Sequence, residues 1–169
     1  MTTRATQGSC SGHRRGFWAT PYREAWRNTM IAGDLMTPDP ITVIPGASVA
    51  EAWDLMRDLD IRQLPVVEGR TLVGMLSDRD LGRMDMAGVL ESGGADALRV
   101  ELATPVVKIM SADVIAVDTE TDLDEVVSLL IEHKVGALPI VSPGTRDVVG
   151  ILSYVDVLRV FQSSLRDDG

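Results

Sequence analysis

The sequence predicts an α+β fold built from two copies of one unit, each with the order β-α-β-β-α, packed about a pseudo-twofold axis. The first observation is an internal repeat, in which "GMLSDRD" (74–80) returns as "GILSYVD" (150–156). The second is that each copy alternates short runs rich in Val and Ile with one helical segment. The third is that one copy has too few strands to bury its own apolar surface, so the two copies are expected to cover each other.

The repeat extends over most of the chain. Met36 aligns with Met110 at an offset of 74 residues, and after the hairpin turn Ser77 aligns with Ser153 at an offset of 76. The change of offset belongs to the turn "SPGTRD", which is longer than its counterpart "EGRT". Because Pro, Gly, Ser and Asp all stay in register, we interpret the chain as a duplication. The predicted organisation is a basic leader (1–30), repeat 1 (31–84), a linker (85–104), repeat 2 (105–161) and a polar tail (162–169).

In the first copy, a strand is predicted at 41–44, and Ser48 with Glu51 forms a capping box that starts a helix. A tight turn at Glu68-Gly69 joins the strands "QLPVV" and "LVGMLS" into a hairpin, and a helix follows through Leu81. The predicted inward face of the first helix consists of Val49, Ala52, Trp53, Met56 and Leu59.

The second copy repeats this order. A strand is predicted at 114–117, a helix at about 122–133, a hairpin from "ALPIV" and "VVGIL", and a last helix through Phe161. Gly93-Gly94 is expected to break any helix in the linker, and short helices are expected in "IAGDLM" and "VVKIM". The predicted inward residues of the second helix are Leu123, Val126, Val127 and Leu130.

Composition and charge exclude several function classes. The net charge of −9 argues against nonspecific nucleic-acid binding and against an anionic membrane surface. No apolar run is long enough to cross a bilayer. The single cysteine, Cys10, cannot form an internal disulfide, which favours a cytoplasmic location. No metal-ligand spacing and no catalytic motif occurs, so we expect neither a metal site nor an enzyme such as a nucleotide hydrolase.

The leader contains five arginines and one glutamate, which makes it basic, and we expect it to be disordered. "RRGF" resembles part of a twin-arginine export signal, but no apolar segment follows, so no export is predicted. An alternative for the leader is a short amphipathic segment, marked by Trp18, Tyr22 and Trp26, that docks on the rest of the chain or on a partner. Met30 is an alternative first residue of the natural protein. The basic charge of the leader is also compatible with a contact to RNA or to an acidic protein.

The repeated Ser and Asp have two interpretations. Each Ser lies where a strand gives way to a helix, where it can cap the helix with the Asp in the first turn. The same groups also suit a ligand, because a hydroxyl with free N–H groups can hold a phosphate and a carboxylate can hold the two hydroxyls of a ribose. Together with aliphatic neighbours for a base, the spacing indicates a nucleoside-phosphate site.

The chain resembles a tandem pair of cystathionine beta-synthase (CBS) domains, known as a Bateman module, over about residues 31–161. The resemblance rests on "DLMTPDPITV", "IRQLPVVEGRTLVGMLSDRDL", "KIMSADVIAV" and "VGALPIVSPGTRDVVGILSYVDVL". It implies a cleft between the copies, in which an adenosine-containing ligand such as AMP, ADP, ATP or S-adenosylmethionine binds in sites built from both copies.

Carried onto this sequence, the resemblance implies two sites. In the first, Asp80 holds the ribose and Ser77 the phosphate; in the second, Asp156 and Ser153 do so, and the first site is expected to bind more strongly because Gly136 and Ala137 leave room for the base. Arg62 and Arg79 are candidate phosphate cations, with solvated surface arginines as the alternative. The predicted first site comprises Ser77, Arg79, Asp80, Ser111, Ile115, Ala116, Gly136 and Ala137. The predicted second site comprises Thr37, Ile41, Thr42, Arg62, Gln63, Ser153 and Asp156.

The resemblance implies a regulatory, energy-sensing module that forms a homodimer and signals to an unidentified client protein. The alternative is a structural dimerisation module with vestigial sites, in which the Ser and Asp pairs are helix caps only. The two interpretations differ in whether Asp80→Ala abolishes a ligand response or only lowers stability.

Overall fold

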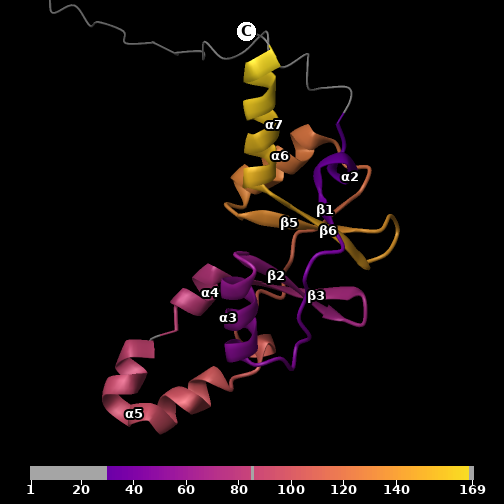
Figure 1. Ribbon diagram of the computed structural model, residues 1–169. Coiled ribbons are helices and arrows are strands. Elements are labelled where there is room, and N and C mark those ends of the chain that lie inside the picture. The colour runs from indigo at the N-terminus through magenta and orange to yellow at the C-terminus, as the bar shows by residue number, and fades with distance from the viewer. Residues whose placement is uncertain (1–29, 85, 168–169) are drawn as a thin grey trace, which may run out of the picture.

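The computed structural model describes residues 30–84 and 86–167, which form two α+β units stacked on each other (Figure 1). This confirms the predicted fold class. Among these residues no helix is long and apolar enough to span a membrane. The first unit contains α3 (Val49–Asp58), β2 (Gln63–Glu68), β3 (Thr71–Ser77), α4 (Asp78–Gly82) and the protruding α5 (Met86–Leu102). The second contains β4 (Val117–Asp118), α6 (Leu123–Glu132), β5 (Ala137–Val141), β6 (Val148–Ser153) and α7 (Tyr154–Asp167).

The leading segment of each copy lies in the other copy's unit. The first copy begins with α2 (Ala32–Leu35) and β1 (Thr37–Pro38), and β1 pairs with β6 to give the sheet order β1-β6-β5-β4. The second copy begins with the short 3-10 helix η1 (Val106–Lys108), after which Ser111 forms a bridge to Met75 in β3. The exchange is therefore reciprocal, and it follows the pseudo-twofold relation that the repeat predicts.

Buried contacts and backbone hydrogen bonds hold the exchanged segments in place. Ala32 is fully buried in the core of the second copy, and Val106 is fully buried in the core of the first. Their backbone N–H groups donate across the copies with matching geometry, from Ala32 to Thr121 O at 2.8 Å and from Val106 to Ala47 O at 2.8 Å. Neither core is complete without a segment from the other copy.

The two hairpins also join at their far ends. Leu72 N donates to Arg146 O at 2.8 Å, and Val148 N donates to Arg70 O at 2.9 Å. A small apolar cluster that includes Leu72 and Val148 lies between the hairpins. The hairpins are thus fixed to each other at this end.

The first predicted strand of each copy is shorter in the structure. In the range 41–44 only Val43 pairs, through Val43 N to Pro65 O at 3.1 Å and Val67 N to Val43 O at 2.9 Å. Pro40 and Pro45 flank this stretch and have no N–H to donate, which limits the pairing to its centre. In the second copy, β4 is a two-residue strand that pairs in parallel with β5.

The predicted inward face of α3 includes two residues that the structure leaves exposed, so their predicted burial is wrong. Ala52 and Met56 are buried, as is Val49, but Trp53 and Leu59 are largely exposed. Trp53 follows Ala52 directly, so its side chain lies about 100° further round the helix, beyond the stripe that meets the sheet. In α6 three of the predicted inward residues are buried and the fourth, Val127, packs partly buried against the same core.

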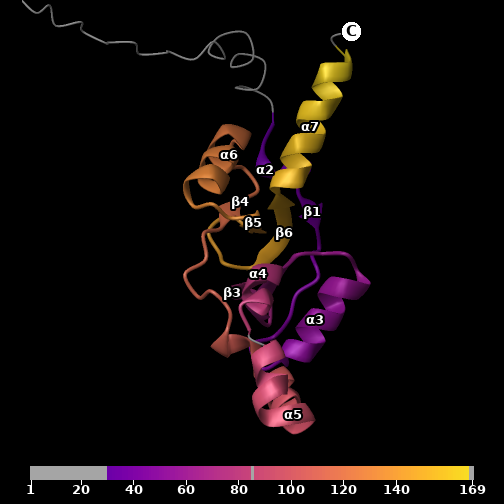
Figure 2. The same ribbon diagram turned by 90° about the vertical axis from the view of Figure 1, so that its left-hand side faces the viewer.

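The linker and the C-terminus contain more helix than the sequence predicts. Gly94 interrupts α5 with a φ of 68°, where a break was predicted, but helical segments lie on both sides of it. The last helix continues six residues beyond the predicted end at Phe161, into the range described as a polar tail. Figure 2 shows α5 and α7 at opposite ends of the molecule. The expectations for residues 1–29 lie outside the described residues.

Gly74 and Gly150 permit the exchange, because a methionine from the other copy's leading segment occupies the space where a side chain would be. A Cβ added at Gly74 would overlap the Met110 sulphur, and one added at Gly150 would overlap the Met36 sulphur. The glycine of "GMLS" and "GILS" is therefore a packing requirement between the copies.

We expect Gly74→Ala and Gly150→Ala each to lower the free energy of unfolding by about 1–3 kcal/mol, because the methionine and its backbone must shift. Urea denaturation measures this. Gly46→Ala is the matched control, since nothing lies within 4 Å of its added Cβ, and its effect should stay within about 0.5 kcal/mol. Equal effects at all three positions would contradict the interlocking of glycine and methionine.

Candidate functional site

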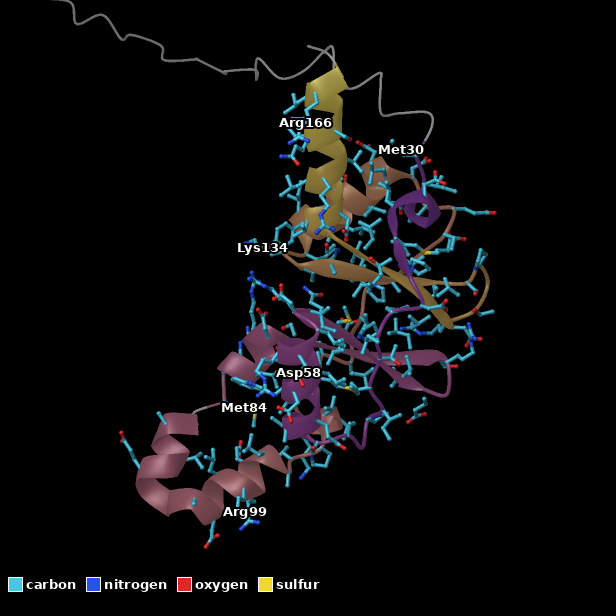
Figure 3. All side chains as sticks on the ribbon, in the orientation of Figure 1. Met30, Asp58, Met84, Arg99, Lys134 and Arg166 are labelled. Carbon is cyan, nitrogen blue, oxygen red and sulfur yellow. The ribbon has the colours of Figure 1, made fainter. Side chains whose placement is uncertain are left out.

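A cleft of about 840 Å³ lies between the two units and is lined by residues of both copies. Lys134, at the boundary between the units in Figure 3, is one of its lining residues. The cleft is continuous, so both predicted sites open into the same space. The predicted site residues that line it are Thr37, Ile41, Arg62, Gln63, Ser77, Arg79, Asp80, Ser111, Ile115, Gly136, Ala137, Ser153 and Asp156.

Two predicted site residues do not line the cleft. Ala116 packs instead against the apolar cluster between the hairpins. Thr42, its equivalent at an offset of 74, is also absent from the lining. Both follow an isoleucine that does line the cleft, and successive side chains of an extended segment point to opposite sides. Ala116 and Thr42 therefore face away from the cleft in this structure, and their part in a ligand site stays a prediction.

The Ser and Asp of each copy are bonded to each other in the same way. Ser77 donates to Asp80 Oδ2 through its hydroxyl at 2.6 Å and its backbone N–H at 2.9 Å. Ser153 donates to Asp156 Oδ2 with the same two distances. The structure therefore contains the capping arrangement that the sequence offers as the first interpretation of this motif.

A third capping box lies outside the cleft, at the start of α3. Ser48 donates to the Glu51 carboxylate from its backbone N–H at 2.7 Å and from its hydroxyl at 2.8 Å. These two hydrogen bonds, the backbone one first, lower the pKa of Glu51 because they stabilise its charged form.

The hairpin register places Arg62 and Gln63 beside the serine of their own copy. Gln63 lies opposite Ser77, and Asp78 N donates to Arg62 O at 3.0 Å. In the same way Ala137 lies opposite Ser153. The prediction grouped Arg62 and Gln63 with the second site, whereas their backbone adjoins the Ser77 end of the cleft.

The space beside Gly136 is already filled. A Cβ at Gly136 would overlap the Gln63 amide nitrogen, which reaches it from the other copy. Tyr154 also approaches this position, at 4.0 Å. Gln63 must therefore move before a ligand base can use the space beside Gly136, and the expected room for a base at this position stays a prediction.

Four charged residues at pseudo-equivalent positions line the cleft but were missed as site residues. Arg83 pairs with Asp80 Oδ1 at 3.5 Å, and Arg159 pairs with Asp156 Oδ1 at 3.1 Å. Asp39 and Asp113 form the second pair of equivalents in the lining. Aligning the repeat beyond Asp80 would have found both arginines, because they keep the offset of 76. Among the described residues no group of three or more His, Cys, Asp or Glu side chains is placed to hold a metal ion.

Comparison with known proteins identifies the family and the fold. A family model for the CBS domain matches residues 32–84 and 106–163, so the chain belongs to the CBS domain family as a tandem pair. The CBS domain-containing protein YhcV of Bacillus subtilis is 32% identical over 124 residues, which cover 73% of this chain and 80% of YhcV. The chain spans less than half the length of other curated relatives that it matches.

Two similar solved structures contain adenosine ligands. The crystal structure of CBSX2 in complex with AMP has a TM-score of 0.66 and 28% identity, covering 83% of this chain and 100% of that chain. The CBS domain pair of protein MJ0100, in complex with 5-methylthioadenosine and S-adenosyl-L-methionine, has a TM-score of 0.63 and 25% identity. That likeness covers 78% of this chain and 99% of the other. The predicted membership of the tandem CBS family is confirmed.

In the ligand-free protein, Asp80→Ala is expected to lower the free energy of unfolding by about 1 kcal/mol, because both Ser77 donors lose their acceptor. Ser77→Ala should cost less, since the carboxylate still accepts from the backbone N–H. The Asp156 and Ser153 variants should follow the same order, measured by urea denaturation. A larger loss of unfolding free energy in the serine variants than in the aspartate variants would show that the hydroxyl, and not the carboxylate, stabilises this helix start.

Proposed function

We propose that this chain is a regulatory module that binds an adenosine-containing ligand in the cleft between its CBS repeats. The ligand class is AMP, ADP, ATP or S-adenosylmethionine. The observation that carries the proposal is that two equivalent Ser–Asp pairs open into one cleft lined by both copies. A single pair is explained by helix capping, but capping alone gives no reason for both pairs to face a shared cavity.

The chemistry of the lining suits a nucleoside. Each carboxylate has lone pairs left after accepting from its serine, and these can accept from the two hydroxyls of a ribose. Ile41 and Ile115 supply apolar surface for a base at equivalent positions in the cleft. The AMP bound by CBSX2 and the S-adenosyl-L-methionine bound by MJ0100 support this ligand class.

The proposed response is a shift between the two units. A ligand that contacts both copies stabilises the arrangement in which its contacts are best, and it shifts the equilibrium by its difference in affinity. The output would pass to a client protein, with the chain acting as a cytoplasmic homodimer and without nucleic acid or membrane. With AMP, ADP or ATP as ligand, the module would sense energy state.

A structural dimerisation module with vestigial sites is the second candidate. It is favoured by the closed geometry of the Ser–Asp pairs, which satisfy each other without a ligand, and by Gln63, which occupies the space beside Gly136. In this case the carboxylates would contribute to stability and to nothing else.

Isothermal titration of ligand-free protein with AMP, ADP, ATP and S-adenosylmethionine distinguishes the two candidates. We expect saturable binding of at least one ligand, and at least a tenfold loss of affinity in the Asp80→Ala, Asp156→Ala double variant, because a charged hydrogen-bond acceptor is lost. The single variants show which half of the cleft binds more strongly.

Asp54→Ala is the matched control, since Asp54 accepts from an arginine three residues on but lies outside the cleft. It should leave the affinity unchanged. Absence of binding for all four ligands would contradict the proposal and favour the structural module, as would wild-type affinity in the double variant.

A further inference from the structure

Arg83 and Arg159 occupy equivalent positions in the two halves of the cleft, and each lies three residues after the motif Asp. Their side chains are 81% and 74% exposed, whereas those of Asp80 and Asp156 are only 15% and 19% exposed. Each arginine therefore extends from a nearly covered carboxylate into the open part of the cleft. An exposed, flexible side chain can leave such a pair at little cost in free energy.

The two oxygens of each carboxylate have different partners. Oδ2 accepts from the serine of the capping box, and Oδ1 accepts from the arginine, in both copies. A ribose that reaches this carboxylate meets an oxygen held by its own capping box and an oxygen held only by an exposed guanidinium. The guanidinium is the partner that a ribose hydroxyl can replace.

At the Ser77 end of the cleft a phosphate needs side-chain cations. The helix that follows Ser77, α4, has only five residues, so its macrodipole is too small to hold an anion by itself. Three other cations line the described part of the cleft, namely Arg62, Arg79 and Lys134. Their equivalents are Gly136, Val155 and Asp60, so none of the three recurs in the other half of the cleft. That list leaves Arg83 and Arg159 as the cations present in both halves.

We propose that Arg83 and Arg159 bind the phosphate of the ligand, each in its own half of the cleft. In the empty cleft each arginine neutralises the motif carboxylate. When ribose hydroxyls bind that carboxylate, the guanidinium turns to the phosphate attached to the same ribose, where it forms charge-assisted hydrogen bonds. The inference rests on the proposed function and adds to it a selection for nucleotides over nucleosides without phosphate.

The alternative is that both arginines form ordinary surface ion pairs within a helix. Arg57 provides the comparison, because it pairs with Asp54 at 2.9 Å with the same spacing of three residues, yet lies outside this cleft. Asp58 and Asp54 raise the pKa of Arg57 by stabilising its charge. If Arg83 and Arg159 only stabilise helices, their removal should affect a nucleoside and a nucleotide to the same degree.

The test is titration of the full chain with adenosine and with AMP. For wild type and Arg57→Ala, we expect AMP to bind more tightly than adenosine by the same factor. The Arg83→Ala, Arg159→Ala double variant should lose about tenfold in AMP affinity, as expected for the loss of a charge-assisted contact, and keep its adenosine affinity. Lysine at both positions should restore part of the preference for AMP, since it keeps the charge.

An unchanged ratio of AMP to adenosine affinity in the double variant overturns this inference and leaves the proposed function standing. Equal affinities of the wild type for AMP and adenosine also overturn it. If the wild type binds neither of these nor ADP, ATP or S-adenosylmethionine, the proposed function fails and the inference fails with it. Thermal unfolding of the ligand-free variants shows whether they are folded, which is expected because both arginines are exposed.

Discussion

The reciprocal exchange of leading segments is the constraint on which the rest of the structure depends. Each copy lends the other a short segment that fills its core, through Ala32 in one direction and Val106 in the other. Met36 packs against Gly150, and Met110 packs against Gly74, each in the hairpin of the other copy. Because these contacts are buried and mutual, separating the copies would expose apolar surface in both at once. The duplication is therefore a single cooperative structure in which each unit completes the other.

The exchange also builds the cleft. The bridge from Ser111 to Met75 brings the leading segment of the second copy beside the strand that ends at Ser77, and β1 does the same for the strand that ends at Ser153. Each end of the cleft consequently combines the motif of one copy with the leading segment of the other. A ligand at either end would contact both copies.

Much of the fold and of the cleft could be predicted from the sequence, because the motif and the strand pattern occur in both copies. The recurring Ser and Asp located both halves of the cleft, and the capping pattern at Ser48 and Glu51 placed the start of α3 where the structure has it. The two hairpins followed from their turns and apolar runs.

The features that the sequence could not predict are contacts between the two copies and the side to which a side chain points within one copy. Trp53 was assigned to the core because spacing alone cannot show where the covering sheet ends. Ala116 and Thr42 were placed in the sites by the family resemblance, and a short extended segment does not reveal which of its faces it turns to the cleft. The Gln63 amide reaches Gly136 across the pseudo-twofold relation, and pairwise alignment of the copies carries no information about such a contact.

Hydrogen–deuterium exchange of the full chain with and without saturating AMP tests most directly the claim that a ligand is held by both copies. The account predicts slower exchange on binding in residues 74–80 together with 111–115, in 150–156 together with 37–41, or in both sets. Slower exchange confined to one copy, or exchange that AMP does not change, would contradict it.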